Sequence, residues 1–133
     1  MNNTILFLCP HAAAKSVIAS AYFNQLAQEH SLRWVGDAAG TDPSPTVAPA
    51  VVSLLQAEGL DVSQHQPRKI SPDELEQAYR VISLGCELED LAIEPELVEQ
   101  WLDVPAPSQD LVGAQQAIRS HVEALIDELR AER

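Results

Sequence analysis

The expected fold of this 133-residue chain is set near its N-terminus by the stretch Thr4-Ile5-Leu6-Phe7-Leu8-Cys9-Pro10-His11-Ala12-Ala13-Ala14-Lys15-Ser16. From Thr4 to Cys9 the residues are apolar and strand-forming, which is typical of a central parallel strand buried on both faces. Pro10 ends this run, and apolar residues then recur at helical spacing from about Ser16 to Glu29. The stretch therefore predicts a buried strand, a tight loop and a helix.

The same alternation continues along the chain. Further strands are predicted at Arg33 to Ala39, Tyr79 to Leu84 and Leu97 to Trp101, and helices at Val47 to Glu58, from Ser71-Pro72-Asp73-Glu74 onward, and at Leu111 to Arg130. Alternating strands and helices indicate an α/β domain with a parallel sheet. Ligands of such folds bind beyond the carboxyl ends of the strands, here Cys9 to Ser16, Ala39 to Pro45, Gly85 to Asp90 and Leu102 to Asp110.

Composition and charge exclude several classes of protein. The chain has 20 Asp and Glu against 8 Lys and Arg, a net charge of -12, which argues against nucleic-acid binding and against docking on an anionic membrane. The early apolar run is too short to span a bilayer, and no cation precedes it as in a signal peptide. Two widely separated cysteines make a poor disulfide scaffold, so we expect a cytoplasmic protein with reduced thiols.

Acidic residues are concentrated in one segment. Between Glu87 and Asp110 there are eight of them and no Lys or Arg: Glu87, Glu89, Asp90, Glu94, Glu96, Glu99, Asp103 and Asp110. A charge run of this kind is typical of a solvated face. If it flanks an anion site, it should slow the approach of dianions, and added salt should relieve the effect.

The loop after the first strand carries the clearest chemical signal. A tight strand-to-helix loop directs successive backbone N–H groups and the helix dipole toward one point, which favours an anion and the thiolate form of Cys9. Lys15 is unfavourable at a helix N-terminus unless an oxyanion lies there. Ser16 could donate to the thiolate or cap the helix. Cys9 could equally be a small buried apolar residue, and Lys15 an exposed one.

These residues resemble the low-molecular-weight protein tyrosine phosphatase superfamily, in particular its arsenate reductase branch, whose loop reads Cys-x5-Arg-Ser. The likeness extends over essentially the whole chain, through Ala39-Gly40, Pro49 to Glu58, Leu60-Asp61-Val62-Ser63-Gln64-His65, Val81-Ile82-Ser83-Leu84-Gly85-Cys86 and Trp101-Leu102-Asp103-Val104-Pro105-Ala106. It implies one α/β domain over residues 1–133, with a four-stranded parallel sheet flanked by helices in three layers.

The resemblance also implies a thiol-dependent oxyanion enzyme, closer to an arsenate reductase than to a phosphatase. Cys9 would be the nucleophile, Cys86 a resolving thiol at the same edge of the sheet, and Asp103 an acid. Lys15 and Ser16 would stabilise the bound oxyanion and the thiolate. The implied oxyanion-binding loop consists of Pro10, His11, Ala12, Ala13, Ala14, Lys15 and Ser16.

Departures from the family pattern define the alternatives. Lys15 replaces the forked Arg, Pro10 lacks an N–H, and the loop has no Gly or Asn for a left-handed backbone. Val104 stands where the family has its acid, one residue after Asp103. These changes weaken phosphotyrosine hydrolysis most, because a tyrosinate leaving group needs a proton. A slow phosphotyrosine or aryl phosphatase and a non-catalytic anion-binding or protein-interaction module remain alternatives.

The cofactor and partner expectations follow from the thiol chemistry. The family's relay uses a third cysteine that this chain lacks, so we expect an external reductant, either of thioredoxin or glutaredoxin type or a small thiol such as mycothiol or glutathione. No other cofactor is expected. The ligand candidates for a metal do not show zinc spacing, so no metal is expected at Cys9, His11, His65, Cys86 or His121.

Overall fold

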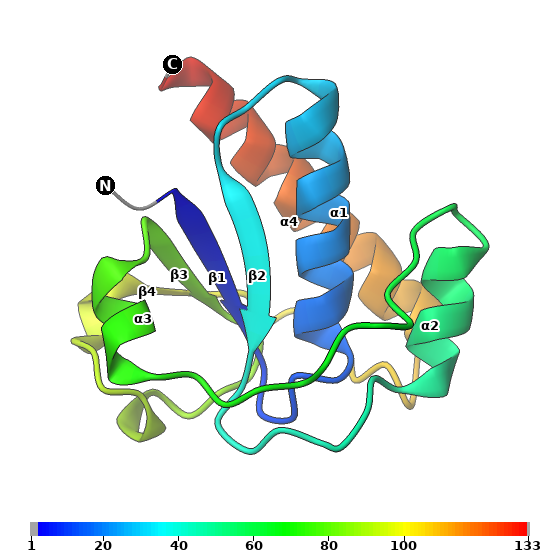
Figure 1. Ribbon diagram of the computed structural model, residues 1–133, viewed down its shortest axis with the longest axis horizontal. Helices are drawn as coiled ribbons and strands as arrows, with labels where there is room; N and C mark the ends of the chain where they lie inside the picture. The colour runs from blue at the N-terminus through cyan, green and yellow to red at the C-terminus, as the bar shows by residue number, and fades with distance from the viewer. Residues whose placement is uncertain (1–2, 133) are drawn as a thin grey trace.

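The computed structural model describes residues 3–132 and is built around one parallel four-stranded sheet. The strands are β1 (Thr4–Leu8), β2 (Val35–Ala39), β3 (Arg80–Ser83) and β4 (Val98–Gln100). Their order in the sheet is β2-β1-β3-β4, so β1 and β3 are neighbours at its centre (Figure 1). Leu8 pairs with Ala39 of β2 on one side and with Ser83 of β3 on the other. The residues that follow these three strands therefore meet at one edge.

Helices cover both faces of the sheet. α1 (Lys15–Glu29) and α4 (Leu111–Ala131) lie against one face, and α2 (Pro49–Gln56) packs beside α1 in the same layer (Figure 1). α3 (Pro72–Gln77) lies on the opposite face, together with short 3₁₀ turns at Leu88–Asp90 and Pro95–Leu97. The predicted three-layer α/β fold is confirmed.

The central strand explains why its sequence is apolar throughout. Ile5 and Phe7 pack toward α1 and α4, whereas Leu6 and Leu8 pack toward α3, and each of the four side chains is at most 1% exposed. Burying a side chain of this size contributes roughly 1.5–3 kcal/mol. β1 is therefore anchored from both faces, and the loop that follows it leaves the sheet from a rigid point.

Several predicted boundaries were wrong by one or two residues. β2 begins at Val35 rather than Arg33, because the ladder to β1 begins at Val35. α2 begins at Pro49 rather than Val47, because Ala48 is extended and its N–H bonds to Ala13. It ends at Gln56, and Gly59, at φ +82°, lies in the turn that follows. β4 is shortened at its start by the 3₁₀ turn at Pro95–Leu97.

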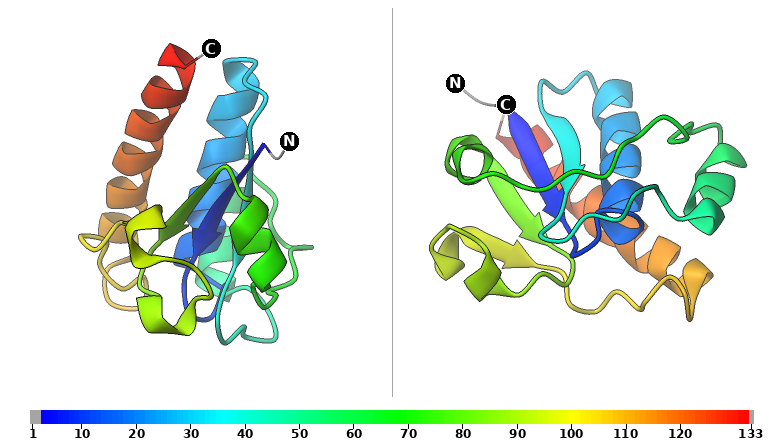
Figure 2. Two further views of the ribbon diagram at one scale, coloured as in Figure 1. Left: turned by 90° about the vertical axis from the view of Figure 1, so that its left-hand side faces the viewer. Right: turned by 60° about the horizontal axis from the view of Figure 1, so that its bottom comes forward.

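All strands run in the same direction, so their carboxyl ends gather at one side of the molecule (Figure 2). The loop from Cys9 to Lys15, the segment after Ala39 and the turn after Ser83 lie together there. The predicted ligand edge of the sheet therefore brings three separate parts of the sequence into one place. Among the described residues, no helix is long and apolar enough to cross a membrane.

Candidate active site

Cys9 lies directly after β1, and its thiol faces Ser16 in the first turn of α1. The thiol is 3.1 Å from Ser16 Oγ, to which it donates, and the backbone N–H of Ser16 donates to Cys9 Sγ at 3.4 Å. Cys9 is 5% exposed and Ser16 is fully buried. If the thiol ionises, the hydroxyl can turn its proton toward the sulfur, so both groups of Ser16 can stabilise a thiolate.

Ser16 does not cap the helix. The N-cap position is occupied by Ala14, which offers no side-chain acceptor. The capping alternative for Ser16 was therefore wrong, because α1 begins one residue earlier than predicted and places this hydroxyl on the inner side of the first turn. Within residues 3–132 the N–H groups of Ala14 and Lys15 at the start of α1 have no acceptor, whereas that of Ser16 donates to Cys9 Sγ, so the first two are available to a ligand.

The loop carbonyls point outward and are held by the segment after β2. The N–H groups of Asp42, Ser44 and Ala48 donate to the carbonyl oxygens of Pro10, His11 and Ala13, at 2.7, 2.9 and 2.9 Å respectively. In a trans peptide group the N–H points away from the C=O. The amides of His11 and Ala14 therefore face the inside of the loop.

Several of these amides are unpaired. Within residues 3–132, the N–H groups of His11, Ala13, Ala14 and Lys15 have no hydrogen-bond acceptor, whereas Ala12 donates to the Cys9 carbonyl at 3.2 Å. Unpaired backbone donors in a structured loop at a helix N-terminus form a binding site for an anion. The loop therefore has unpaired donors of the kind that the predicted cradle needs, fewer by the missing N–H of Pro10 and by the internal bond of Ala12.

Two backbone features hold the loop in this shape. Ala12 has φ +52°, a left-handed conformation that is uncommon for a residue with a side chain. Alanine thus adopts a backbone conformation for which the family uses Gly or Asn, and its side chain is completely buried. Gly40, at the end of β2, lies so close to the loop that a Cβ there would come within 3.0 Å of Ala12 N and closer still to two loop carbonyl oxygens. Only glycine fits at this point.

Lys15 folds back toward the end of β3. Its Nζ lies 3.8 Å from the position that a Cβ on Gly85 would occupy, beside Pro10. The side chain is half-buried, and within residues 3–132 it has no carboxylate within 4.0 Å. The ammonium group is thus held near the loop and keeps its charge available to a bound anion.

Cys86 is the second thiol at this edge of the sheet. It is 5% exposed, it is not in a disulfide, and its backbone N–H donates to Ser83 Oγ at 3.0 Å. Burial raises the pKa of its thiol, the nearby Cys9 adds to this, and hydrogen bonds from Thr41 and Ser83 oppose it. Cys86 is therefore a thiol that favours its protonated form, and it lies at the sheet edge that the family resemblance implied.

Asp103 is engaged with α4 rather than free. His121 Nε2 lies 2.6 Å from Asp103 Oδ1, and this hydrogen bond lowers the pKa of the carboxyl below its ordinary value. The His121 ring stacks on Trp101 with centroids 4.6 Å apart and planes at 11°. Val104, where the family has its acid, is buried in the core. The lowered pKa favours the ionised carboxylate of Asp103, which opposes its predicted role as a proton donor.

The acidic segment is not uniformly solvated. Glu99 pairs with Arg80 of β3 and accepts from Trp101 Nε1 at 2.7 Å, and Asp110 caps α4 by accepting from the N–H of Gly113. Glu87, Glu89, Asp90, Glu94 and Glu96 are exposed as expected. Within residues 3–132, no group of three or more His, Cys, Asp or Glu is arranged to hold a metal ion.

Sequence reasoning did not single out Thr41 or His121 for these contacts. Thr41 lies in the quoted segment after β2, but its hydrogen bond to Cys86 joins residues that are far apart in sequence. His121 was weighed only as a metal ligand. In the helical pattern His121 stands beside the buried residues Val122 and Leu125, at the margin of the apolar stripe of α4. This position could have indicated that its side chain contacts a neighbouring loop.

Comparisons with known proteins identify the family of this chain. The family model for low molecular weight phosphotyrosine protein phosphatase matches residues 4–132. A putative arsenate reductase from Halobacterium salinarum is 32% identical over 102 residues, covering 74% of this chain and 72% of that protein.

Solved structures confirm the fold. YfkJ from Bacillus subtilis matches with a TM-score of 0.88 at 21% identity, over 100% of this chain and 98% of that one. A thioredoxin-dependent arsenate reductase from Corynebacterium glutamicum matches with a TM-score of 0.81 at 22% identity, over 99% of this chain and 64% of that one.

The fold and the cysteine loop define a small α/β enzyme that handles oxyanions through a thiol. The chain belongs to the low molecular weight phosphotyrosine protein phosphatase family, whose relatives include arsenate reductases as well as phosphatases. The predicted family is therefore confirmed, and Cys9 stands where the family's nucleophile begins its loop.

Proposed function

We propose that this protein is an arsenate reductase in which Cys9 is the nucleophile and Cys86 the resolving thiol. The observation that carries the proposal is the second thiol: Cys86 lies at the same sheet edge as the anion loop, close enough to Cys9 for the two sulfurs to interact electrostatically. A hydrolytic phosphatase has no step for this thiol. A reductase needs one.

The reaction begins at the loop. The unpaired amides of His11, Ala14 and Lys15, together with the Lys15 ammonium, hold the arsenate oxygens. The Cys9 thiolate, stabilised by Ser16, attacks arsenic, and one arsenate oxygen leaves as water after taking up a proton. The result is a Cys9–S–As(V) adduct that keeps the negative oxygens within the same cradle.

Reduction follows at sulfur. Cys86 loses its proton, its sulfur attacks Cys9 Sγ, the S–As bond breaks, and its electron pair stays on arsenic, which leaves as arsenite. Two thiols are oxidised to one Cys9–Cys86 disulfide and As(V) is reduced to As(III), so the electrons balance. Cys86 must approach to disulfide distance, with the Cα atoms within about 7 Å. An external thiol then reduces the disulfide.

The loop after β4, which contains Asp103, gives less support to a phosphatase function. A phosphate ester needs a proton for its leaving alkoxide, and losing that donor typically costs ~10²–10⁴ in rate. Asp103 is the candidate donor, but its bond to His121 lowers the pKa of the carboxyl. The first step with arsenate also needs a proton, because a hydroxyl leaves as water. The proton that Cys9 gives up on becoming the nucleophile balances this step, so it does not require Asp103.

The experiment uses dithiothreitol as a generic reductant, so that it tests the chemistry without assuming the natural one. Arsenite production from arsenate is measured for the wild type, for Cys9→Ser and for Cys86→Ser, with thermal unfolding as the folding control. We expect turnover in the wild type, none in Cys9→Ser, and a rate at least tenfold lower in Cys86→Ser. Lys15→Gln should raise the KM for arsenate about tenfold.

Two outcomes would assign the protein a different function. Steady hydrolysis of p-nitrophenyl phosphate without arsenate reduction would make the protein a slow aryl phosphatase. Phosphate binding at the loop, seen by calorimetry, without either activity would make it an anion-binding module. The proposed chemistry needs free thiols, so we place it in a reducing, cytoplasmic environment.

A further inference from the structure

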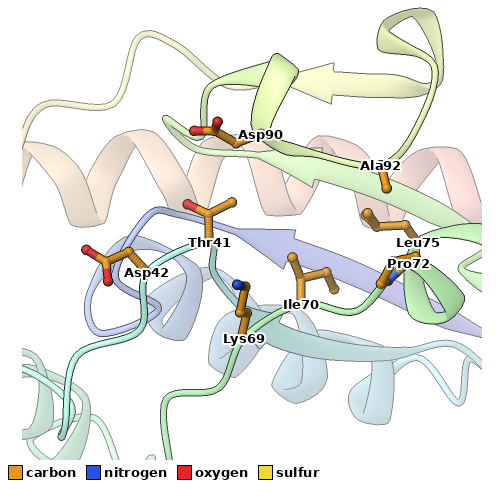
Figure 3. Close-up of a pocket in the computed structure, with 8 residues that line it drawn as sticks. All are labelled: Thr41, Asp42, Lys69, Ile70, Pro72, Leu75, Asp90 and Ala92. Carbon is orange, nitrogen blue, oxygen red and sulfur yellow. The ribbon is translucent and has the colours of Figure 1, made fainter.

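An open pocket of about 570 Å³ lies beside Cys86 on the α3 side of the sheet (Figure 3). It has two ends of different character. Near the Cys9 loop it is lined by Thr41, Asp42, Lys69 and Asp90, and away from the loop by Ile70, Pro72, Leu75 and Ala92. The first end offers one cation and two carboxylates, and the second end is apolar.

Thr41 is the wall that the pocket shares with the second thiol. Its side chain lines the pocket, and its proximity to the Cys86 sulfur lowers the pKa of that thiol. Cys86 also packs in the same buried cluster as Ile70 and Leu75, which line the pocket. Cys86 itself is 5% exposed. The pocket therefore reaches to within one side chain of a sulfur that is otherwise shielded from solvent.

Lys69 is fixed at the polar end by the backbone. The backbone carbonyl of Arg68 accepts from the N–H of Gly40 at 3.0 Å, and the N–H of Ile70 donates to the Gly40 carbonyl at 2.9 Å. Lys69, between them, therefore forms a parallel bridge with Gly40. Figure 3 shows its side chain rising beneath Thr41. The neighbouring Arg68 forms salt bridges with Asp37 and Glu74, so its charge is not available to the pocket.

The two lysines of the chain share an unusual property in so acidic a protein. Within residues 3–132 neither Lys15 nor Lys69 has a carboxylate within 4.0 Å, although the chain has 20 acidic residues. Lys15 lies against Gly85, the residue before Cys86. Lys69 lies beneath Thr41, the residue that interacts with Cys86. Lys15 thus lies close to the residue before Cys86, and Lys69 lines the pocket together with Thr41.

We propose that this pocket binds the external reductant, and that the reductant is a small thiol of the amino-acid or short-peptide class, with both carboxylate and ammonium groups. This inference rests on the proposed reductase function and deepens it. Lys69 would hold a carboxylate of the thiol and Asp42 or Asp90 its ammonium group. The apolar end would take the methylene part of the molecule, and the sulfur would point past Thr41 toward Cys86.

The chemistry of this step balances with two molecules of the thiol. The first loses its proton and attacks Cys86 Sγ in the Cys9–Cys86 disulfide, which releases Cys9 as a thiolate and leaves a mixed disulfide on Cys86. The second attacks the sulfur of the bound thiol, which releases Cys86 and a small-molecule disulfide. The two thiols supply the two electrons that arsenate consumed.

The structure favours a small thiol over a protein thiol. Cys86 is recessed, so a cysteine on the surface of a folded partner would meet the rim of the pocket before it reached the sulfur. The exposed carboxylates of Glu87 and Glu89 lie beside Cys86 in sequence and would repel an acidic partner. The pocket, of about 570 Å³, has room for a molecule of peptide size.

The test measures binding separately from turnover. S-methylglutathione keeps the charges of a peptide thiol but cannot exchange sulfur, and its binding to the reduced, full-length protein is followed by backbone amide shifts. We expect shifts at Thr41 and Ile70, and about tenfold weaker binding in Lys69→Gln. Arg130→Gln makes the same charge change at the exposed end of α4 and should bind like the wild type.

A second measurement follows the thiol step. The oxidised protein is reduced by glutathione and, in parallel, by dithiothreitol, which carries no charge. The ratio of the glutathione rate to the dithiothreitol rate should fall about tenfold in Lys69→Gln and stay unchanged in Arg130→Gln. Oxidised glutathione should place its adduct on Cys86 in the Cys9→Ser variant, as peptide mass mapping would show.

The outcomes separate this inference from the function on which it rests. Absence of shifts at the pocket amides, or equal binding by Lys69→Gln and the wild type, overturns the pocket even if dithiothreitol supports arsenate reduction. Reduction of the oxidised protein by a thioredoxin but not by glutathione overturns it as well. If S-methylglutathione binds as expected while arsenate is not reduced with dithiothreitol, the reductase proposal fails and the thiol site stands.

Discussion

His121 Nε2 lies 2.6 Å from Asp103 Oδ1, and the imidazole ring stacks on Trp101, two residues before Asp103. One side chain of α4 thereby holds both the carboxylate and the aromatic ring of the loop that follows β4. Trp101 also contacts Phe7 of β1, with centroids 5.7 Å apart. The loop in which the family carries its acid is thus tied to the helix layer and to the central strand.

Replacing His121 should loosen this loop. We expect His121→Ala to lower the free energy of unfolding by about 1 kcal/mol, mainly from the lost stacking on Trp101, and to bring the pKa of Asp103 back toward its ordinary value. Urea unfolding measures the first effect, and carboxyl chemical shifts against pH measure the second. Gln116→Ala, an exposed change on the same helix, is the control. An Asp103 titration that does not move would contradict the bond.

Ser16 should control the reactivity of Cys9. Ser16→Ala removes the hydroxyl that lies 3.1 Å from the sulfur but keeps the backbone N–H, so we expect alkylation of Cys9 at pH 7 to slow about tenfold. The rate is measured with iodoacetamide in a Cys86→Ser background, where Cys9 is the remaining thiol. Ser20→Ala serves as the control, because that hydroxyl bonds to the Val17 carbonyl. Equal rates in the two variants would exclude the role of Ser16.

The thiol of Cys86 should lose its proton at a higher pH than an ordinary cysteine. Its folded-state pKa is raised, first by burial and then by Cys9, so its neutral thiol is favoured by folding. The resulting stabilisation is fully present below the pKa of an unfolded thiol, about 8.5, and is lost as pH rises through the folded pKa. We expect alkylation of Cys86 near pH 9 to be slower than in urea, with peptide mapping to separate it from Cys9. In Cys9→Ser the delay should shrink, and an unchanged delay would mean that the two sulfurs do not interact.

Gly40 should tolerate no side chain. A Cβ at this position would press on two loop carbonyl oxygens and on Ala12 N, all of them backbone atoms that cannot move aside singly. We expect Gly40→Ala to lower the free energy of unfolding by about 3 kcal/mol or more. Gly59→Ala is the matched variant, because Gly59 has positive φ but open space around it, and it should cost only about 1 kcal/mol. Similar losses in both variants would show that crowding at the loop is not the cause.

Much of the fold was readable from local patterns. The buried strand Thr4–Leu8 was predicted because its apolar run is continuous, and α4 because its apolar residues keep one helical stripe. The edges of elements were less predictable. β2 and α2 each begin two residues later than their sequences suggested, because the ladder to β1 and the bond from Ala48 to the loop determine where they begin.

The site divides in the same way. Cys9, Lys15 and Ser16 could be assigned from their spacing, because a strand, a loop and a helix start in succession place them around one point. The role of Ser16 needed coordinates, since a shift of one residue in the helix start decides whether its hydroxyl caps the helix or faces the thiol. The engagement of Asp103 with His121 joins two segments whose sequences carry no sign of each other.

The sequence by itself determined the α/β fold, because the fold depends on hydrophobic periodicity, and the spacing after the first strand located the predicted anion loop. The neighbouring positions of the two cysteines were implied by the family resemblance, which supplied the strand order. Only the tertiary structure decided which charges remain free. Arg68 and Arg80 are paired with carboxylates, whereas within residues 3–132 neither Lys15 nor Lys69 has a carboxylate within 4.0 Å. Ion pairs depend on which side chains from distant segments come within a few ångströms, and no local pattern encodes that distance.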